Sequence, residues 1–129
     1  MSTPKINGLA HFGLYINDIE RSVAFYKKLG FEPFFSTKNG DFPVTFIRNN
    51  DCVIELVQFP DGISREDGWF DHVALSVTDI DGVKADLESK GIVFEEDTYT
   101  IAPHCFENGS KWVLFRGPDG EHIELNERL

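Results

Sequence analysis

The sequence lacks any long hydrophobic run and contains few cysteines. No stretch approaches the roughly 18 apolar residues that a membrane-spanning helix needs, and the opening residues, Met1-Ser-Thr-Pro-Lys-Ile6, lack the apolar segment of a signal peptide. We therefore expect no membrane partner and a cytoplasmic location. The two cysteines, Cys52 and Cys105, are too few for a disulfide framework and have no CxxC spacing, which indicates two reduced thiols.

Basic residues are also scarce. There are 12 Lys and Arg against 22 Asp and Glu, which gives a formal net charge of −10. A chain of this charge repels phosphate backbones, so we expect no nucleic acid partner. Hydrophobic residues make up 41% of the chain and include twelve Phe, so a packed core is expected. The length fits one domain, residues 1–129.

One segment of the chain occurs twice. Residues 71–92 have the pattern of a strand, a capped helix and a glycine stop, and residues 11–31 repeat that order at a constant offset of 61 positions. The matching pairs include His11 with His72, Asp18 with Asp79, Ala24 with Ala85, and Gly30 with Gly91. A constant offset indicates an internal duplication. We expect two similar modules, at about residues 6–60 and 69–127.

Each module also carries a glutamate in its last expected strand. Ile54-Glu55-Leu56 matches Ile123-Glu124-Leu125 at an offset of 69 positions. Taken alone, a glutamate such as Glu55 would more often be an edge residue or half of an ion pair. Strand alternation, however, places both histidines on the face away from the following helix. Two His and two Glu are a suitable ligand set for one divalent metal.

Periodicity and turn residues predict the remaining elements. We expect strands at 8–16, 44–48, 52–59, 71–77, 93–98, 111–116 and 121–126, helices at 19–29 and 80–90, a polar connection at 36–41, a linker at 60–68 and an irregular segment at 99–109. His104 and His122 have no counterpart in the first module, so we interpret both as surface or pocket residues.

This order resembles the vicinal oxygen chelate superfamily, which includes glyoxalase I, methylmalonyl-CoA epimerase, extradiol dioxygenases, fosfomycin-resistance transferases and bleomycin-binding proteins. The motifs that carry the resemblance are DIERSVAFY at 18–26 with Gly30-Phe31, DHVALSV at 71–77, and GPDGEHIEL at 117–125. The resemblance implies an α+β fold in which two tandem βαβββ modules form a curved mixed sheet around a metal-binding cavity.

The site residues are most similar to those of bacterial glyoxalase I, because His11, Glu55, His72 and Glu124 match its four metal ligands. The resemblance implies one divalent ion per site (Ni, Zn, Co or Mn). It also implies a lyase that converts the hemithioacetal of methylglyoxal and a low-molecular-weight thiol into a thioester through an enediolate. Two alternatives stay open: another enzyme of the superfamily, such as an epimerase or a thiol transferase, and a metal-bearing protein that binds a small ligand.

One position departs from glyoxalase I. Tyr15 stands four residues after the first histidine, where glyoxalase I usually has an arginine that holds glutathione. This departure argues against glutathione as the thiol and leaves the thiol open, and we expect Tyr15 to contact the substrate. The substrate partner is a small molecule.

The two glutamates are expected to divide the work of the reaction. A carboxylate that leaves the ion can act as the base for a substrate C–H. Glu55 lies between two valines, whereas Glu124 lies between His122 and Asn126, and the apolar setting favours Glu55 as the retained ligand and Glu124 as the base. We also expect a homodimer, because symmetric pairing would complete two half-open sheets.

Overall fold

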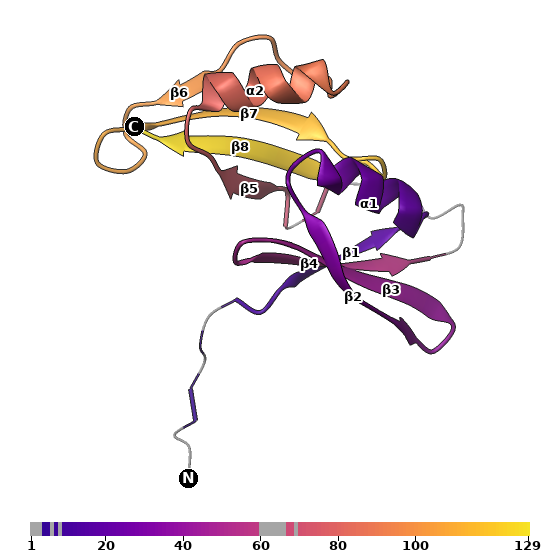
Figure 1. Ribbon diagram of the computed structural model, residues 1–129. Coiled ribbons are helices and arrows are strands. Elements are labelled where there is room, and N and C mark those ends of the chain that lie inside the picture. Colours follow the sequence, from indigo (N-terminus) through magenta and orange to yellow (C-terminus); the bar gives the residue numbers. More distant parts are fainter. Residues whose placement is uncertain (1–3, 6, 8, 60–66, 69) are drawn as a thin grey trace. The chain divides into compact units, whose positions relative to one another are not determined.

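The computed structural model describes residues 4–5, 7, 9–59, 67–68 and 70–129. The chain divides into two compact units, Met1–Asp61 and Gly62–Leu129, which we name module one and module two. Among the described residues, each module consists of a strand, a helix and three further strands (Figure 1). The predicted α+β class and the tandem βαβββ order are confirmed. Most of the predicted linker at 60–68 lies outside the described residues.

Module one forms a four-stranded mixed sheet with its helix along one face (Figure 1). Its elements are β1 (Phe12–Ile16), α1 (Ile19–Lys27), β2 (Glu32–Asn39), β3 (Phe42–Asn49) and β4 (Cys52–Gln58), in the sheet order β1-β4-β3-β2. Strand β1 runs parallel to β4, and the other pairs are antiparallel. The N-cap Asp18 accepts a hydrogen bond from the backbone N–H of Arg21 at 3.2 Å. After the helix, Gly30 adopts φ +90°, which favours glycine.

Helix α1 and the sheet bury the core of module one between them. The most deeply buried apolar residues of this layer are Ile16, Tyr26, Phe31, Ile47, Ile54 and Leu56. Within the helix, Ser22 and Tyr26 are buried, whereas Val23 stays half-buried. Ser22 lies one turn before Tyr26, so both side chains fall on the same face.

Module two repeats the architecture. Its elements are β5 (Val73–Ser76), α2 (Ile80–Ser89), β6 (Thr100–Ala102), β7 (Ser110–Arg116) and β8 (His122–Arg128), in the sheet order β5-β8-β7-β6. Asp79 caps α2 by accepting from the backbone N–H of Gly82 at 3.2 Å, and Gly91 adopts φ +90° after the helix. The duplication seen in the sequence is therefore a duplication of sheet topology. Among the described residues, neither helix is long and apolar enough to cross a membrane.

Two predicted boundaries are wrong. No regular strand forms at 93–98: Phe94 makes an isolated bridge to Phe115, and the strand of this region is β6, which begins at Thr100. Three consecutive acidic residues at 95–97 offer no alternating apolar face that could hold a strand on the core. The polar segment at 36–39 is part of β2, where the hydroxyls of Ser36 and Thr45 hydrogen-bond at 3.0 Å across the hairpin.

The two strands that follow the candidate histidines begin later than predicted. β1 begins at Phe12 and β5 at Val73, so His11 and His72 each lie directly before a strand. The two cysteines are free thiols, as predicted. Burial raises the pKa of the Cys52 thiol, which keeps it protonated near neutral pH.

Candidate metal site

In module one, the structure brings His11 and Glu55 together. The parallel pairing of β1 with β4 places Gly13 opposite Glu55. As a result, Nε2 of His11 lies 3.7 Å from Oε1 of Glu55. A Cβ at Gly13 would lie 3.3 Å from the same Oε1, so glycine leaves room for the carboxylate. The edge of the His11 ring packs against Phe46, with 5.2 Å between ring centroids.

In module two, the equivalent residues form an equivalent pair. The parallel pairing of β5 with β8 places Ala74 opposite Glu124, and Nε2 of His72 lies 3.4 Å from Oε1 of Glu124. The other carboxylate oxygen, Oε2, accepts a hydrogen bond from Nδ2 of Asn126 at 2.8 Å. The four residues singled out in the sequence therefore form two His–Glu pairs, one in each module. Their meeting around a single ion stays a prediction.

The separation of the donor atoms fits a divalent metal. Metal–nitrogen and metal–oxygen bonds of about 2.0–2.2 Å place neighbouring ligand atoms about 3.0–3.4 Å apart in octahedral or tetrahedral geometry. The 3.4 Å pair of module two lies in this range, and the 3.7 Å pair of module one would close by a few tenths of an ångström. Imidazole and carboxylate together suit borderline divalent ions such as zinc and nickel. Each module offers two such ligands, whereas protein metal sites usually have three or four.

The burial of the two glutamates is the reverse of what their sequence neighbours predicted. The side chain of Glu124 is 9% exposed, and that of Glu55 is 28% exposed. The valines at positions 53 and 57 therefore do not enclose the Glu55 carboxylate. Glu124 is fixed by Asn126, whereas Glu55 has His11 as its polar neighbour. The structure therefore gives Glu55 more freedom to move than Glu124.

The sequence analysis missed two residues beside His72. Oδ2 of Asp71 lies 2.8 Å from Nδ1 of His72, which is hydrogen-bond distance. The same oxygen lies 3.6 Å from Nδ1 of His122. His122 is therefore a neighbour of the candidate site, and its side chain is 12% exposed. His104 lies exposed in a turn after β6 and does not join this group.

A network of ion pairs continues beyond His122. Nε2 of His122 lies 3.2 Å from Oε1 of Glu95, and Nε of Arg116 donates to the same oxygen at 2.8 Å. Arg116 also binds Asp67 through both carboxylate oxygens. The guanidinium lowers the pKa of the Asp67 carboxyl, and the carboxylates raise the pKa of Arg116. No sequence pattern indicates this network, because its members lie on different elements.

A second group of possible ligands shares part of this network. Ligand atoms of Asp67, Asp71 and His122 all lie within 4.8 Å of one another, which is close enough to hold a metal ion. Arg116, however, already supplies a positive charge to Asp67. A cation at this place would compete with the guanidinium. The His72 and Glu124 pair has no cationic side chain against it in the described residues and is the better candidate.

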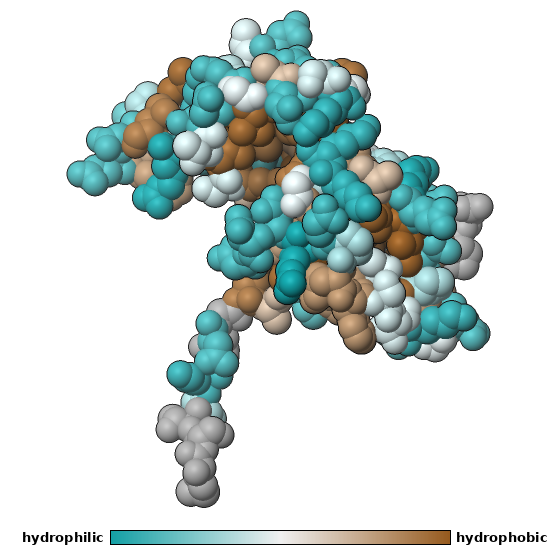
Figure 2. Space-filling model, in the orientation of Figure 1, coloured by the Kyte–Doolittle hydropathy of each residue, from teal (hydrophilic) through white to brown (hydrophobic). Residues whose placement is uncertain are grey.

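Tyr15 lies on the same strand as Gly13 and on the same face. Its ring packs against Phe59 with 4.5 Å between centroids, and Phe59 stacks on Phe42 at 4.6 Å. Tyr15 is 61% exposed. Figure 2 shows further hydrophobic side chains at the surface of β2, where Phe34 and Phe35 are 43% and 58% exposed. Module one thus presents aromatic rings near the His11 and Glu55 pair.

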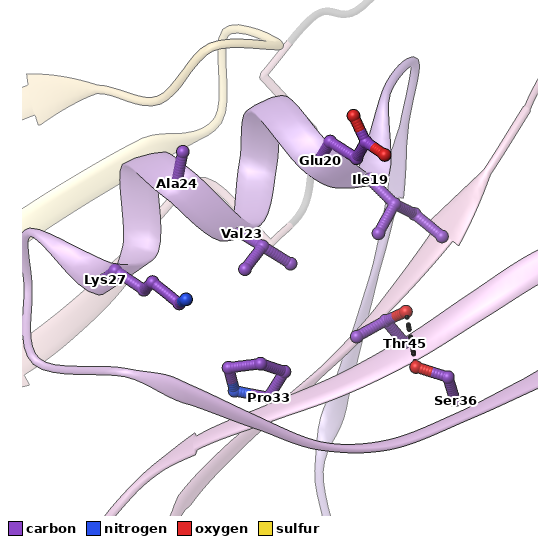
Figure 3. A pocket seen from close by; sticks show the side chains of 8 residues that line it. All are labelled: Ile19, Glu20, Val23, Ala24, Lys27, Pro33, Ser36 and Thr45. Atoms are coloured by element: carbon purple, nitrogen blue, oxygen red, sulfur yellow. Dashed lines mark hydrogen bonds between the residues drawn. The ribbon is translucent and has the colours of Figure 1, made fainter.

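A separate groove lies between α1 and the strands β2 and β3 (Figure 3). Its volume is about 370 Å³, and it is lined by Ile19, Glu20, Val23, Ala24, Lys27, Pro33, Ser36 and Thr45. Thr45 precedes Phe46, which is paired with Glu55, so strand alternation puts the groove on the opposite face of the sheet from Glu55. The groove holds no His–carboxylate pair and is not part of the candidate site.

Comparison with known proteins gives consistent matches over nearly the whole chain. The profile of the Glyoxalase/Bleomycin resistance protein/Dioxygenase superfamily matches residues 8–125. Protein YwbC of Bacillus subtilis (strain 168), described as uncharacterized, is 30% identical over 127 residues, which cover 92% of this chain and 95% of that protein.

Solved structures are similar in fold. A glyoxalase family protein from Enterococcus faecalis superimposes with a TM-score of 0.78 at 22% identity, covering 94% of this chain and 98% of that one. The fosfomycin resistance protein FosX from Listeria monocytogenes, crystallised with Mn(II) and sulfate, gives a TM-score of 0.72 at 17% identity, covering 97% and 95%. At these identities the likeness concerns the fold alone.

Proposed function

Because the chain belongs to the Glyoxalase/Bleomycin resistance protein/Dioxygenase superfamily, we propose that it is a metal-dependent lyase or isomerase of glyoxalase I type. The superfamily assignment confirms the resemblance seen in the sequence motifs. The observation that carries the proposed activity is the presence of one His–Glu pair in each module, with Nε2 to Oε1 separations of 3.7 Å and 3.4 Å.

The four residues have distinct tasks in this proposal. His11, Glu55, His72 and Glu124 would hold one divalent ion, which supplies Lewis acidity toward two adjacent substrate oxygens and acidifies the C–H between them. Glu55 takes that proton and returns it to the neighbouring carbon. We assign this role to Glu55 rather than to Glu124, because Glu55 is more exposed and, among the described residues, accepts no hydrogen bond like the one that Asn126 donates to Glu124.

The proposed substrate is the hemithioacetal of methylglyoxal and a low-molecular-weight thiol other than glutathione. Tyr15 replaces the arginine that would hold a glutathione carboxylate, and its ring lies among aromatic neighbours. A phenol and apolar rings bind a thiol with apolar groups better than one with free carboxylates, because a carboxylate placed against apolar rings loses its hydration without a compensating partner. We propose that Tyr15 contacts the thiol portion.

The proposed activity is tested with metal-free protein that is reloaded with nickel, zinc, cobalt or manganese. Methylglyoxal is offered in parallel with glutathione, with cysteine and with cysteamine, which has no carboxylate, and thioester formation is followed by absorbance. We expect turnover that depends on the added ion, that is abolished by a chelator, and that is weaker with glutathione than with another thiol. Stoichiometric metal binding without turnover of any hemithioacetal would refute the lyase. Consumption of fosfomycin in the same panel would assign a resistance enzyme instead.

We further propose that the active form is a homodimer. A module that supplies two ligands needs a second module to complete an ion's coordination, and symmetric pairing of two chains completes two sites at once. Sedimentation velocity of the metal-loaded protein should show a dimer. A monomer with full metal content and full activity would show that one chain is sufficient.

A further inference from the structure

The two histidines of the candidate site differ in the side chain that contacts Nδ1 of the ring. Nδ1 of His72 lies 2.8 Å from Oδ2 of Asp71. The residue that corresponds to Asp71 in module one is Ala10, which precedes His11 and has no polar side-chain atom. Among the described residues, the structure shows no hydrogen-bond partner for Nδ1 of His11. The two modules therefore contain equivalent histidines, of which His72 has a carboxylate at Nδ1 and His11 does not.

A carboxylate at Nδ1 decides where a neutral imidazole carries its proton. Ionised Asp71 can only accept a hydrogen bond, so the proton of His72 is held at Nδ1 and the lone pair is left at Nε2. Nε2 of His72 also has a carboxylate neighbour, Oε1 of Glu124 at 3.4 Å, but the 2.8 Å contact of Nδ1 with Asp71 is the shorter of the two and decides where the proton lies. His11 has one carboxylate contact among the described residues, from Nε2 to Oε1 of Glu55 at 3.7 Å, and this contact favours the opposite tautomer.

Asp71 itself lies beside a second imidazole. Nδ1 of His122 lies 3.6 Å from Oδ2 of Asp71, and the other nitrogen of His122 lies 3.2 Å from Glu95. His122 is nearly buried at 12% exposure, whereas Asp71 is 55% exposed. The carboxylate therefore lies beside a nearly buried ring and is itself accessible to solvent, so replacing it should leave the core packing unchanged.

We propose that Asp71 is a positioning residue that presents Nε2 of His72 to the metal. Module two is then the preorganised half of the site, because Asp71 orients His72 and Asn126 orients Glu124. Module one, with Ala10 behind His11, adapts when the ion arrives. This inference rests on the proposed metal site for its purpose, but the tautomer that it specifies exists in the metal-free protein. Loss of a carboxylate partner of a ligating histidine typically weakens metal binding about 10–100-fold.

The first test uses long-range ¹H–¹⁵N NMR of the metal-free protein at a pH where the rings are neutral. We expect His72 to carry its proton at Nδ1 and His11 to carry it at Nε2, so that His11 is the internal reference. Asp71→Ala should move the proton of His72 to Nε2, and Asp71→Asn, which keeps an acceptor oxygen, should leave it at Nδ1. Asp67→Asn removes a charge from the same cluster without touching His72 and should change neither ring.

The second test measures the Kd for zinc by chelator competition. Asp71→Ala should weaken zinc binding about 10–100-fold in the native background and have no further effect in a His72→Ala background. A proton at Nε2 of His72 in the unmodified protein would overturn the inference, and so would an equal loss of zinc affinity in both backgrounds. If no zinc binds at all, the proposed function fails, while the tautomer measurement still decides whether Asp71 orients His72.

Discussion

Replacing each glutamate by glutamine separates the base from the ligand that stays on the ion. Glu55→Gln keeps the size and packing of the side chain but removes its ability to accept a proton. Glu55 is the less restrained of the two carboxylates, because it is 28% exposed and its polar neighbour is His11 at 3.7 Å. Loss of a positioned general base costs about 10²–10⁴-fold in turnover. We therefore expect Glu55→Gln to lose at least a hundredfold, which corresponds to about 2.7 kcal/mol.

Glu124→Gln should behave differently. Its carboxylate is 9% exposed and accepts a hydrogen bond from Asn126 at 2.8 Å, so the substitution removes a buried, charge-assisted contact and a ligand together. We expect weaker metal binding, with turnover restored in part by excess ion. The assay measures metal content by elemental analysis and turnover by thioester absorbance in the same samples. A larger loss in Glu124→Gln than in Glu55→Gln, at full metal occupancy in both, would refute the assignment of Glu55 as the base.

Three further predictions concern binding, stability and pH. Tyr15→Ala should raise KM for the thiol conjugate without changing metal content, because its ring lies on the open face of module one; an unchanged KM would indicate simple packing. Gly30→Ala should destabilise the protein by more than Gly91→Ala, for which we expect about 1–3 kcal/mol from the positive φ alone. Both glycines have φ +90°, but a Cβ at Gly30 would lie 2.8 Å from Nδ2 of Asn49, whereas a Cβ at Gly91 would meet no atom within 4 Å. Equal losses of stability in thermal unfolding of the two variants would contradict this prediction. Burial and the hydrogen-bonded carboxylate of Asp81 raise the pKa of Tyr99 to about 12. The contribution of the protonated Tyr99 to stability is therefore complete below the ordinary tyrosine pKa and is lost as the pH rises through about 12. Tyrosinate absorbance should show this late ionisation.

The duplication explains why so much of the site could be predicted from sequence. A constant offset aligned His11 with His72, and the matching apolar residues around Glu55 and Glu124 aligned the second ligand of each pair. Parallel pairing of the first and last strands of a module then brings each His to its Glu. These relations depend on strand order and alternation, which a sequence pattern records.

The residues that were missed depend on features that a pattern does not record. Alternation along a strand would send Asp71 and His72 to opposite faces, yet the two side chains touch because β5 begins only at Val73. The contact of His122 with Glu95 joins β8 to a segment outside the regular strands. The reversed burial of the two glutamates has the same origin, since exposure depends on the whole surface above a side chain and not on its sequence neighbours.

The central proposal is that the two His–Glu pairs bind one ion together. The most direct measurement is calorimetric titration of the metal-free protein with zinc, repeated on His11→Ala and His72→Ala. The account predicts one ion per chain in the native protein and a large loss of affinity in both variants, because the ion draws ligands from both modules. Two ions per chain, or unchanged affinity in His11→Ala, would contradict a shared site and point to the group of Asp67, Asp71 and His122 in module two.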